Sequence, residues 1–90
     1  MNTTTMTHAE VMRDLKHSVG EALRAKRGSQ EARDSREYIH ELGIVLCEMG
    51  GTKAMSDALY AVCNLLDDPH YGRAMAIMDH AFDGIGGWAA

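Results

Sequence analysis

The 90-residue chain contains little proline and cysteine and few aromatic residues, and no uninterrupted apolar run approaches the ~20 residues that cross a membrane. Its single proline excludes a proline-rich linker. The two cysteines, Cys47 and Cys63, are isolated and form no CxxC pattern, which favours buried, reduced side chains over a disulfide framework. The first residues lack the basic start and apolar stretch of a signal peptide, so we expect a cytoplasmic protein.

Apolar residues make up 46% and charged residues 24% of the chain, as in an ordinary globular protein. A chain of this length forms one domain with a thin core, which a partner or a second copy would stabilise. The net charge of −4 disfavours nonspecific nucleic-acid binding, but the charge is unevenly placed. Residues 1–36 hold seven Lys and Arg against five Asp and Glu, whereas residues 37–90 hold two against eight. This asymmetry favours association between copies of the chain, and we expect a homodimer.

Glycines and the proline divide the sequence into four segments, within which apolar residues recur at helical spacing. We expect residues 1–6 to form a flexible tail and residues 7–90 to form a single helical domain. Because the connections are short, consecutive helices should be antiparallel. The sequence therefore predicts an all-α, antiparallel four-helix bundle-like domain, made of a long helical hairpin (about 7–27, 29–49) packed on a short one (about 52–66, 69–83).

Residues that stabilise helix ends occur at these boundaries. Thr7 and Glu10 form a capping-box sequence, and Ser29 can cap the second helix. Asp68 and Pro69 predict an aspartate cap followed by proline at the first helical position. The glycines expected to end helices are Gly28, Gly50, Gly51 and Gly84.

The predicted core consists of one apolar stripe on each helix. The stripes are Val11, Leu15, Val19, Ala22 and Leu23; Ala32, Ser35, Ile39, Leu42, Leu46 and Met49; Met55, Ala58, Leu59, Val62 and Leu66; and Tyr71, Ala74, Met75, Met78 and Phe82. Seven methionines are many for this length, and they suit a surface that repacks around a partner as well as a core.

No arrangement of residues in the sequence supports catalysis. Asp67 and Asp68 lie at a helix start, where acidic residues have a structural role, and no serine lies in a nucleophile-elbow sequence. The glycine pair before Thr52 and Lys53 lacks the spacing of a phosphate-binding loop. We therefore expect a protein that is not an enzyme and that uses no cofactor.

The strongest candidates for a metal site are two histidines and two cysteines. Seven residues separate the members of each pair, which places their Cα atoms about 10 Å apart along a helix. Zinc sites use tighter spacing, so we expect no metal, and convergence of the four side chains is the least favoured alternative. These residues are His40, Cys47, Cys63 and His70.

Basic residues gather around the first turn between helices. Arg33 and Arg36 lie early in the second helix, where cations are unfavourable, so their placement has no structural explanation. This basic tip is the only part of the sequence suited to nucleic acid, and a nucleic-acid-associated regulator is the alternative function. The tip consists of Arg24, Lys26, Arg27, Arg33 and Arg36.

Several large side chains lie away from the predicted core stripes or near the chain's end. They favour a small non-enzymatic protein–protein interaction module, an adaptor, regulator or inhibitor. Trp88, in a glycine-rich tail, either anchors a partner or folds back onto the bundle. The residues expected to contact a protein partner are Ile44, His40, Cys47, Tyr60 and Trp88.

Overall fold

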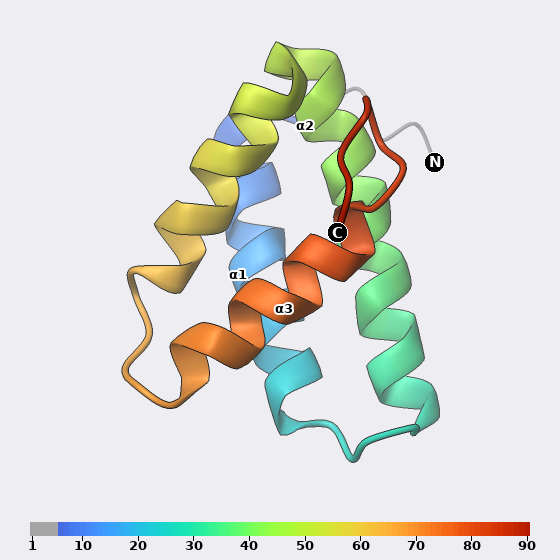
Figure 1. Ribbon diagram of the computed structural model, residues 1–90, viewed down its shortest axis with the longest axis vertical. Helices are drawn as coiled ribbons and strands as arrows, with labels where there is room; N and C mark the ends of the chain where they lie inside the picture. The colour runs from blue at the N-terminus through green and yellow to red at the C-terminus, as the bar shows by residue number, and fades with distance from the viewer. Residues whose placement is uncertain (1–5) are drawn as a thin grey trace.

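The computed structural model describes residues 6–90, and this part of the chain is helical with no strand (Figure 1). Its helices are α1 (His8–Arg24), α2 (Gln30–Cys63) and α3 (His70–Phe82). They pack against one another with a radius of gyration of 12.0 Å. The predicted all-α, bundle-like fold is confirmed. Between residues 6 and 90, no helix combines the length and apolar character needed to span a membrane.

A sharp kink divides α2 at the glycine pair. Gly50 has φ −164° and ψ 23°, and Gly51 has φ 71° and ψ −162°, a combination that essentially only glycine adopts. The kink separates an arm of residues 30–49 from an arm of residues 52–63, so the four expected helical segments are present within three elements. The first arm pairs with α1 as the long hairpin, and α3 crosses α1 diagonally (Figure 1).

The caps explain where the helices begin. Thr7 Oγ1 accepts from the Glu10 amide at 3.2 Å, and the Glu10 carboxylate accepts from the Thr7 amide at 2.9 Å, which completes the predicted capping box. Ser29 Oγ accepts from the Ala32 amide at 3.2 Å. The predicted aspartate cap at Asp68 is wrong, because α3 begins at His70 with Pro69 in the cap position and no side-chain cap.

The predicted helix boundaries differ from the observed ones by up to three residues. At the start of α3, where no side chain caps the helix, the backbone amides of His70 and Tyr71 donate to the carbonyl of Asp67. Most of the predicted N-terminal tail, residues 1–5, lies outside the described residues. Met6, its last residue, is half-buried against the core.

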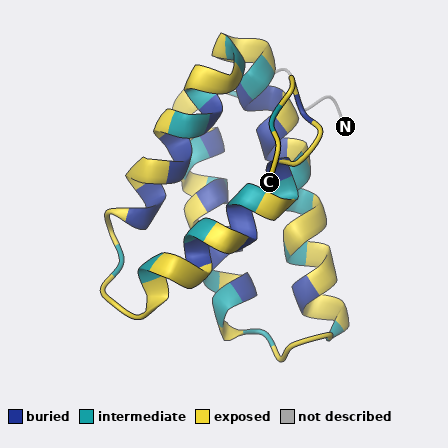
Figure 2. Ribbon diagram, in the orientation of Figure 1, coloured by how far each residue is buried: buried dark blue, intermediate teal, exposed yellow. Residues whose placement is uncertain are grey.

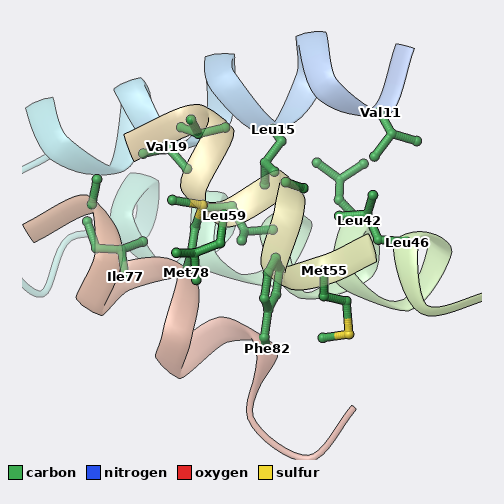
Figure 3. Close-up of a cluster of buried hydrophobic side chains, with 14 of the residues drawn as sticks. Val11, Leu15, Val19, Leu42, Leu46, Met55, Leu59, Ile77, Met78 and Phe82 are labelled. Carbon is green, nitrogen blue, oxygen red and sulfur yellow. The ribbon is translucent and has the colours of Figure 1, made fainter. Parts of the chain in front are cut away.

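The core lies between the two hairpins, where the buried faces of all helices point inward (Figures 2 and 3). The predicted stripes supply most of it, but Met49 is 42% exposed because it lies beside the kink rather than under the second arm. Val45 and Ile77 are buried and were missed. Gly43 has no room for a side chain, because an added Cβ would lie 2.6 Å from Cδ1 of Phe82.

The C-terminal segment folds back over the end of α3 and onto α2. Trp88 stacks edge-on against Phe82, with ring centroids 5.4 Å apart, and its Nε1 donates to Asp79 at 2.8 Å. Ile85 is buried in the turn after α3. Of the two roles considered for Trp88, the structure places it as a cover over the core.

Tyr38→Phe is expected to lower the free energy of unfolding by about 1 kcal/mol and to flatten its pH dependence. The Tyr38 hydroxyl donates to Asp14 at 2.5 Å and so joins α2 to α1. This hydrogen bond lowers the pKa of Asp14 and raises the pKa of Tyr38 to about 12.

The Asp14 contribution is therefore present above its unfolded pKa of about 4 and is lost as pH falls through the folded value. The Tyr38 contribution is present below about pH 10 and is lost as pH rises through the folded pKa of about 12. Chemical denaturation at a series of pH values measures the loss of stability at low pH and at high pH. Tyr60→Phe, at an exposed tyrosine, is the control. Identical pH profiles for Tyr38→Phe and the wild type would contradict the assignment.

Candidate functional site

The residues expected to contact a protein partner do not form one surface. Ile44 and Tyr60 are 40% and 50% exposed, but they lie on different arms of α2. His40 Nδ1 lies 2.6 Å from the carbonyl oxygen of Ala81. Cys47 is half-buried beneath the C-terminal segment, and Trp88 is bonded within the domain. Three of the five side chains therefore make contacts within the domain: His40 with α3, Cys47 with the C-terminal segment, and Trp88 with α3.

The four candidate metal ligands do not assemble into a site. Within residues 6–90, no group of three or more His, Cys, Asp or Glu side chains is arranged to hold a metal ion. Cys63 is buried, where desolvation raises the pKa of its thiol, and its Sγ faces the Tyr71 carbonyl at 4.0 Å. Cys47 Sγ lies where a Cβ at Gly86 would approach within 2.7 Å. Both thiols have packing roles.

The five residues of the basic tip are exposed, but they are not equivalent. Arg33 donates to the Gly28 carbonyl and to the Gln30 side chain, each at 3.1 Å, and so fastens the start of α2. The Arg24 guanidinium lies back along α1, 3.3 Å from the position of a Cβ on Gly20. Lys26 lines neither of the hollows that lie beside this tip. Two members of the tip remain, Arg27 and Arg36.

Arg27 and Arg36 line two adjoining hollows together with a third arginine, Arg73 of α3. One hollow, of about 170 Å³, is bordered by all three arginines, and the other, of about 270 Å³, is bordered by Arg27, Arg36 and His80. The two share part of their wall. We call the combined site the arginine pocket. Its remaining lining residues are Ala22, Ala25, Ala32, Ala76 and Ile77.

Residues at helical spacing on α2 and α3, together with the end of α1, line the arginine pocket. Ala32 and Arg36 are one turn apart on α2, while Arg73 and His80 lie two turns apart on one face of α3. At the end of α1 the lining residues are Ala22 and Ala25, whose small side chains leave room for the pocket. The end of α1 and the starts of α2 and α3 lie at the same end of the molecule (Figure 1).

The arginine pocket has a concentrated positive charge. The ion pairs in residues 6–90 join Arg13 to Asp14, His17 to Glu21 and Lys53 to Asp57, and none of them includes a pocket arginine. Three arginine side chains therefore line one small space, and none of them forms an ion pair with a carboxylate of the described residues. A guanidinium offers several N–H donors in a planar fork, which matches carboxylate and phosphate oxygens. The site can hold an anion.

An acidic hollow of about 280 Å³ lies between α1 and α2 and shares no residue with the arginine pocket. Its carboxylates are those of Glu21, Glu31 and Asp34, and Asp34 accepts a hydrogen bond from Gln30 at 2.7 Å. One copy of the protein thus presents a basic site and an acidic site at different positions on its surface. Opposite charges of this kind favour contact between copies.

No protein-family model, curated protein or solved structure matches the chain. The function of the arginine pocket therefore rests on its geometry and charge. The basic tip proposed from the sequence contains two of its three arginines. Arg73 was missed because it lies in the acidic half of the chain, although its seven-residue spacing from His80 places both on one helical face.

Proposed function

We propose that the protein is a non-enzymatic interaction module, an adaptor, regulator or inhibitor, that docks an acidic segment of a partner protein at the arginine pocket. The observation that supports this is the convergence of Arg27, Arg36 and Arg73 around one hollow with no ion-pair partner in residues 6–90. A cluster of arginines attracts acidic groups over long range and orients them at contact. The proposed docking surface thus differs from the five residues that the sequence predicted to contact a partner, Ile44, His40, Cys47, Tyr60 and Trp88.

A nucleic-acid-associated regulator is the second candidate, favoured by the exposure of all five residues of the basic tip. Affinity for nucleic acid depends on several cations spread along a phosphate backbone. Here Arg33 is bonded locally and Arg24 turns away, which leaves a compact pocket on a protein of net charge −4. These features favour a single acidic segment over a polyanionic strand.

The proposal keeps the cytoplasmic location expected from the sequence, where cysteines such as Cys47 and Cys63 are ordinarily free thiols. A homodimer stays a prediction of the charge asymmetry between residues 1–36 and residues 37–90. The acidic hollow and the arginine pocket are a separate reason to expect contact between copies. Light scattering tests it directly. A mass of one protomer at tens of micromolar would remove self-association from the proposal without affecting docking of another protein.

Arg36→Gln and Arg73→Gln are each expected to weaken binding of a glutamate-rich peptide by about tenfold or more, since each removes a charge-assisted hydrogen bond. Fluorescence anisotropy of the labelled peptide measures the dissociation constant. Arg24→Gln is the matched control, because it removes the same charge from the same tip but not from the pocket. It should change affinity by less than about threefold.

Equal losses from Arg24→Gln and Arg36→Gln would contradict docking at the pocket. If a single-stranded oligonucleotide also bound with these equal losses, the nucleic-acid candidate would replace the proposal. Failure of every acidic peptide to bind would reject the arginine pocket as a docking site for acidic segments.

A further inference from the structure

We infer that the arginine pocket binds a phosphate monoester dianion, the group carried by a phosphorylated serine or threonine. This inference rests on the proposed function and names the chemistry of the partner that docks. The relevant features are the number of arginines, the size of the hollows and the nature of their walls.

The charge of the pocket exceeds what one carboxylate neutralises. Arg27, Arg36 and Arg73 contribute three formal positive charges, and no ion pair in residues 6–90 offsets them. A carboxylate brings one negative charge and two oxygens, whereas a phosphate monoester at neutral pH carries about −1.5 to −2 and three acceptor oxygens. Each of the three guanidinium groups can thus bond a different phosphoryl oxygen, whereas a carboxylate has only two oxygens.

Each hollow of the pocket is small, and all three arginines line only the one of about 170 Å³. Taken singly, the volumes of about 170 and 270 Å³ are below the ~300–1,000 Å³ that encloses a drug-sized ligand. Both lie at the surface, bordered by exposed arginines. A phosphoryl group that projects from a larger molecule fits this arrangement better than an entire small molecule does.

The walls favour a tetrahedral head on a short apolar stem. Alanines of three helices and the aliphatic side chain of Ile77 line the space between the charged groups. They offer no hydrogen-bond acceptor from their side chains that would compete with the ligand for the arginine donors. A methylene or methyl carbon of a phosphorylated side chain can contact them while the oxygens face the guanidinium groups.

The three arginines of the pocket come from three different parts of the fold. Arg36 lies one turn after Ala32 on α2, and Arg73 lies one turn after the start of α3, so they approach the pocket from separate helices. Arg27 lies in the turn after α1, near Gly28, whose φ of 78° allows the chain to reverse there. Three independent positions thus surround the hollow.

Isothermal titration calorimetry with three matched peptides tests the inference. The peptides differ at one position, which is phosphoserine, glutamate or serine in an otherwise neutral sequence. We expect the phosphoserine peptide to bind about tenfold or more tightly than the glutamate peptide, and the serine peptide not to bind. Arg36→Lys and Arg73→Lys keep the charge but remove the fork, and each should weaken phosphoserine binding by about tenfold. Arg24→Lys is the control and should leave both affinities unchanged.

The NMR resonances of the arginine Nε–H groups provide a second readout that does not depend on affinity. Phosphoserine peptide and inorganic phosphate should both shift the signals of Arg27, Arg36 and Arg73 and leave that of Arg13 in place. Shifts spread over all exposed arginines would overturn the assigned site.

The outcomes separate this inference from the proposed function. Equal binding of phosphoserine and glutamate peptides, with equal loss in Arg36→Gln, would overturn the phosphate inference and leave docking of acidic segments intact. Arg73-dependent binding of inorganic phosphate with no peptide binding would support the phosphate site and overturn docking of a protein partner. Tighter binding of a 5′-phosphorylated oligonucleotide than of the phosphopeptide would overturn a protein as the source of the phosphate.

Discussion

Replacing Phe82 by alanine is expected to lower the free energy of unfolding by about 3–5 kcal/mol. The ring is fully buried at the end of α3, with Met78 and Met55 nearby in the core (Figure 3). It lies against Gly43 so closely that an added Cβ there would be 2.6 Å away, and Trp88 covers it edge-on. Removal of the ring leaves a cavity that this backbone crossing cannot collapse to fill. A domain of this length has about 5–13 kcal/mol of stability in total, so much of it would be lost.

Urea denaturation followed by circular dichroism measures this loss, and the fluorescence of Trp88 reports the same site. Phe82→Leu is the control, because it retains most of the apolar volume and should cost roughly half as much. A cost below about 1 kcal/mol for Phe82→Ala would contradict the deep burial of the ring. If the alanine variant does not fold, the leucine variant still measures the contribution of the site.

Gly51→Ala is expected to lower the free energy of unfolding by about 1–3 kcal/mol, although its side chain would meet no neighbouring atom. The cause is the backbone, since φ 71° with ψ −162° is a conformation that an alanine Cβ disfavours. The residue also directs the second arm of α2 back toward α1. An alanine that stabilises a straight α2 would therefore oppose the packing of residues 52–63.

Gly72→Ala is the matched control for this substitution. Gly72 lies within α3, where an added Cβ likewise meets nothing within 4 Å, and its φ is not positive. Alanine there should stabilise the protein by about 0.5–1 kcal/mol through its better helix propensity. The same chemical change thus has opposite expected signs at the two positions. Equal effects in thermal denaturation would show that backbone conformation at the kink is unimportant.

The helices and most of the core could be predicted because they depend on local sequence. The Thr7–Glu10 capping box and the Ser29 cap need only neighbouring residues, and both are present. Met49 was placed in the core because its spacing continues the stripe of the second helix. The kink that follows it turns the chain away before another helix can cover this side chain, and periodicity does not report that turn.

The site was only partly predictable for a different reason. Arg27 and Arg36 stood out because they lie close in sequence and Arg36 opposes the helix dipole. Arg73 is one of two basic residues in residues 37–90, and only the diagonal crossing of α3 brings it beside them. Trp88 and Cys47 were considered for a partner, but the fold-back of the C-terminal segment, closed by the Trp88–Asp79 hydrogen bond, uses both within the domain.

The three arginines of the pocket come from separate parts of the chain, and this has a consequence for assembly. The α1–α2 hairpin supplies Arg27 and Arg36, whereas Arg73 arrives only when α3 docks across it. The pocket is therefore incomplete in any intermediate in which the hairpin has formed and α3 has not docked. An anion held between Arg36 and Arg73 would act as a non-covalent cross-link between the hairpin and α3, and would stabilise the closed bundle over the open one.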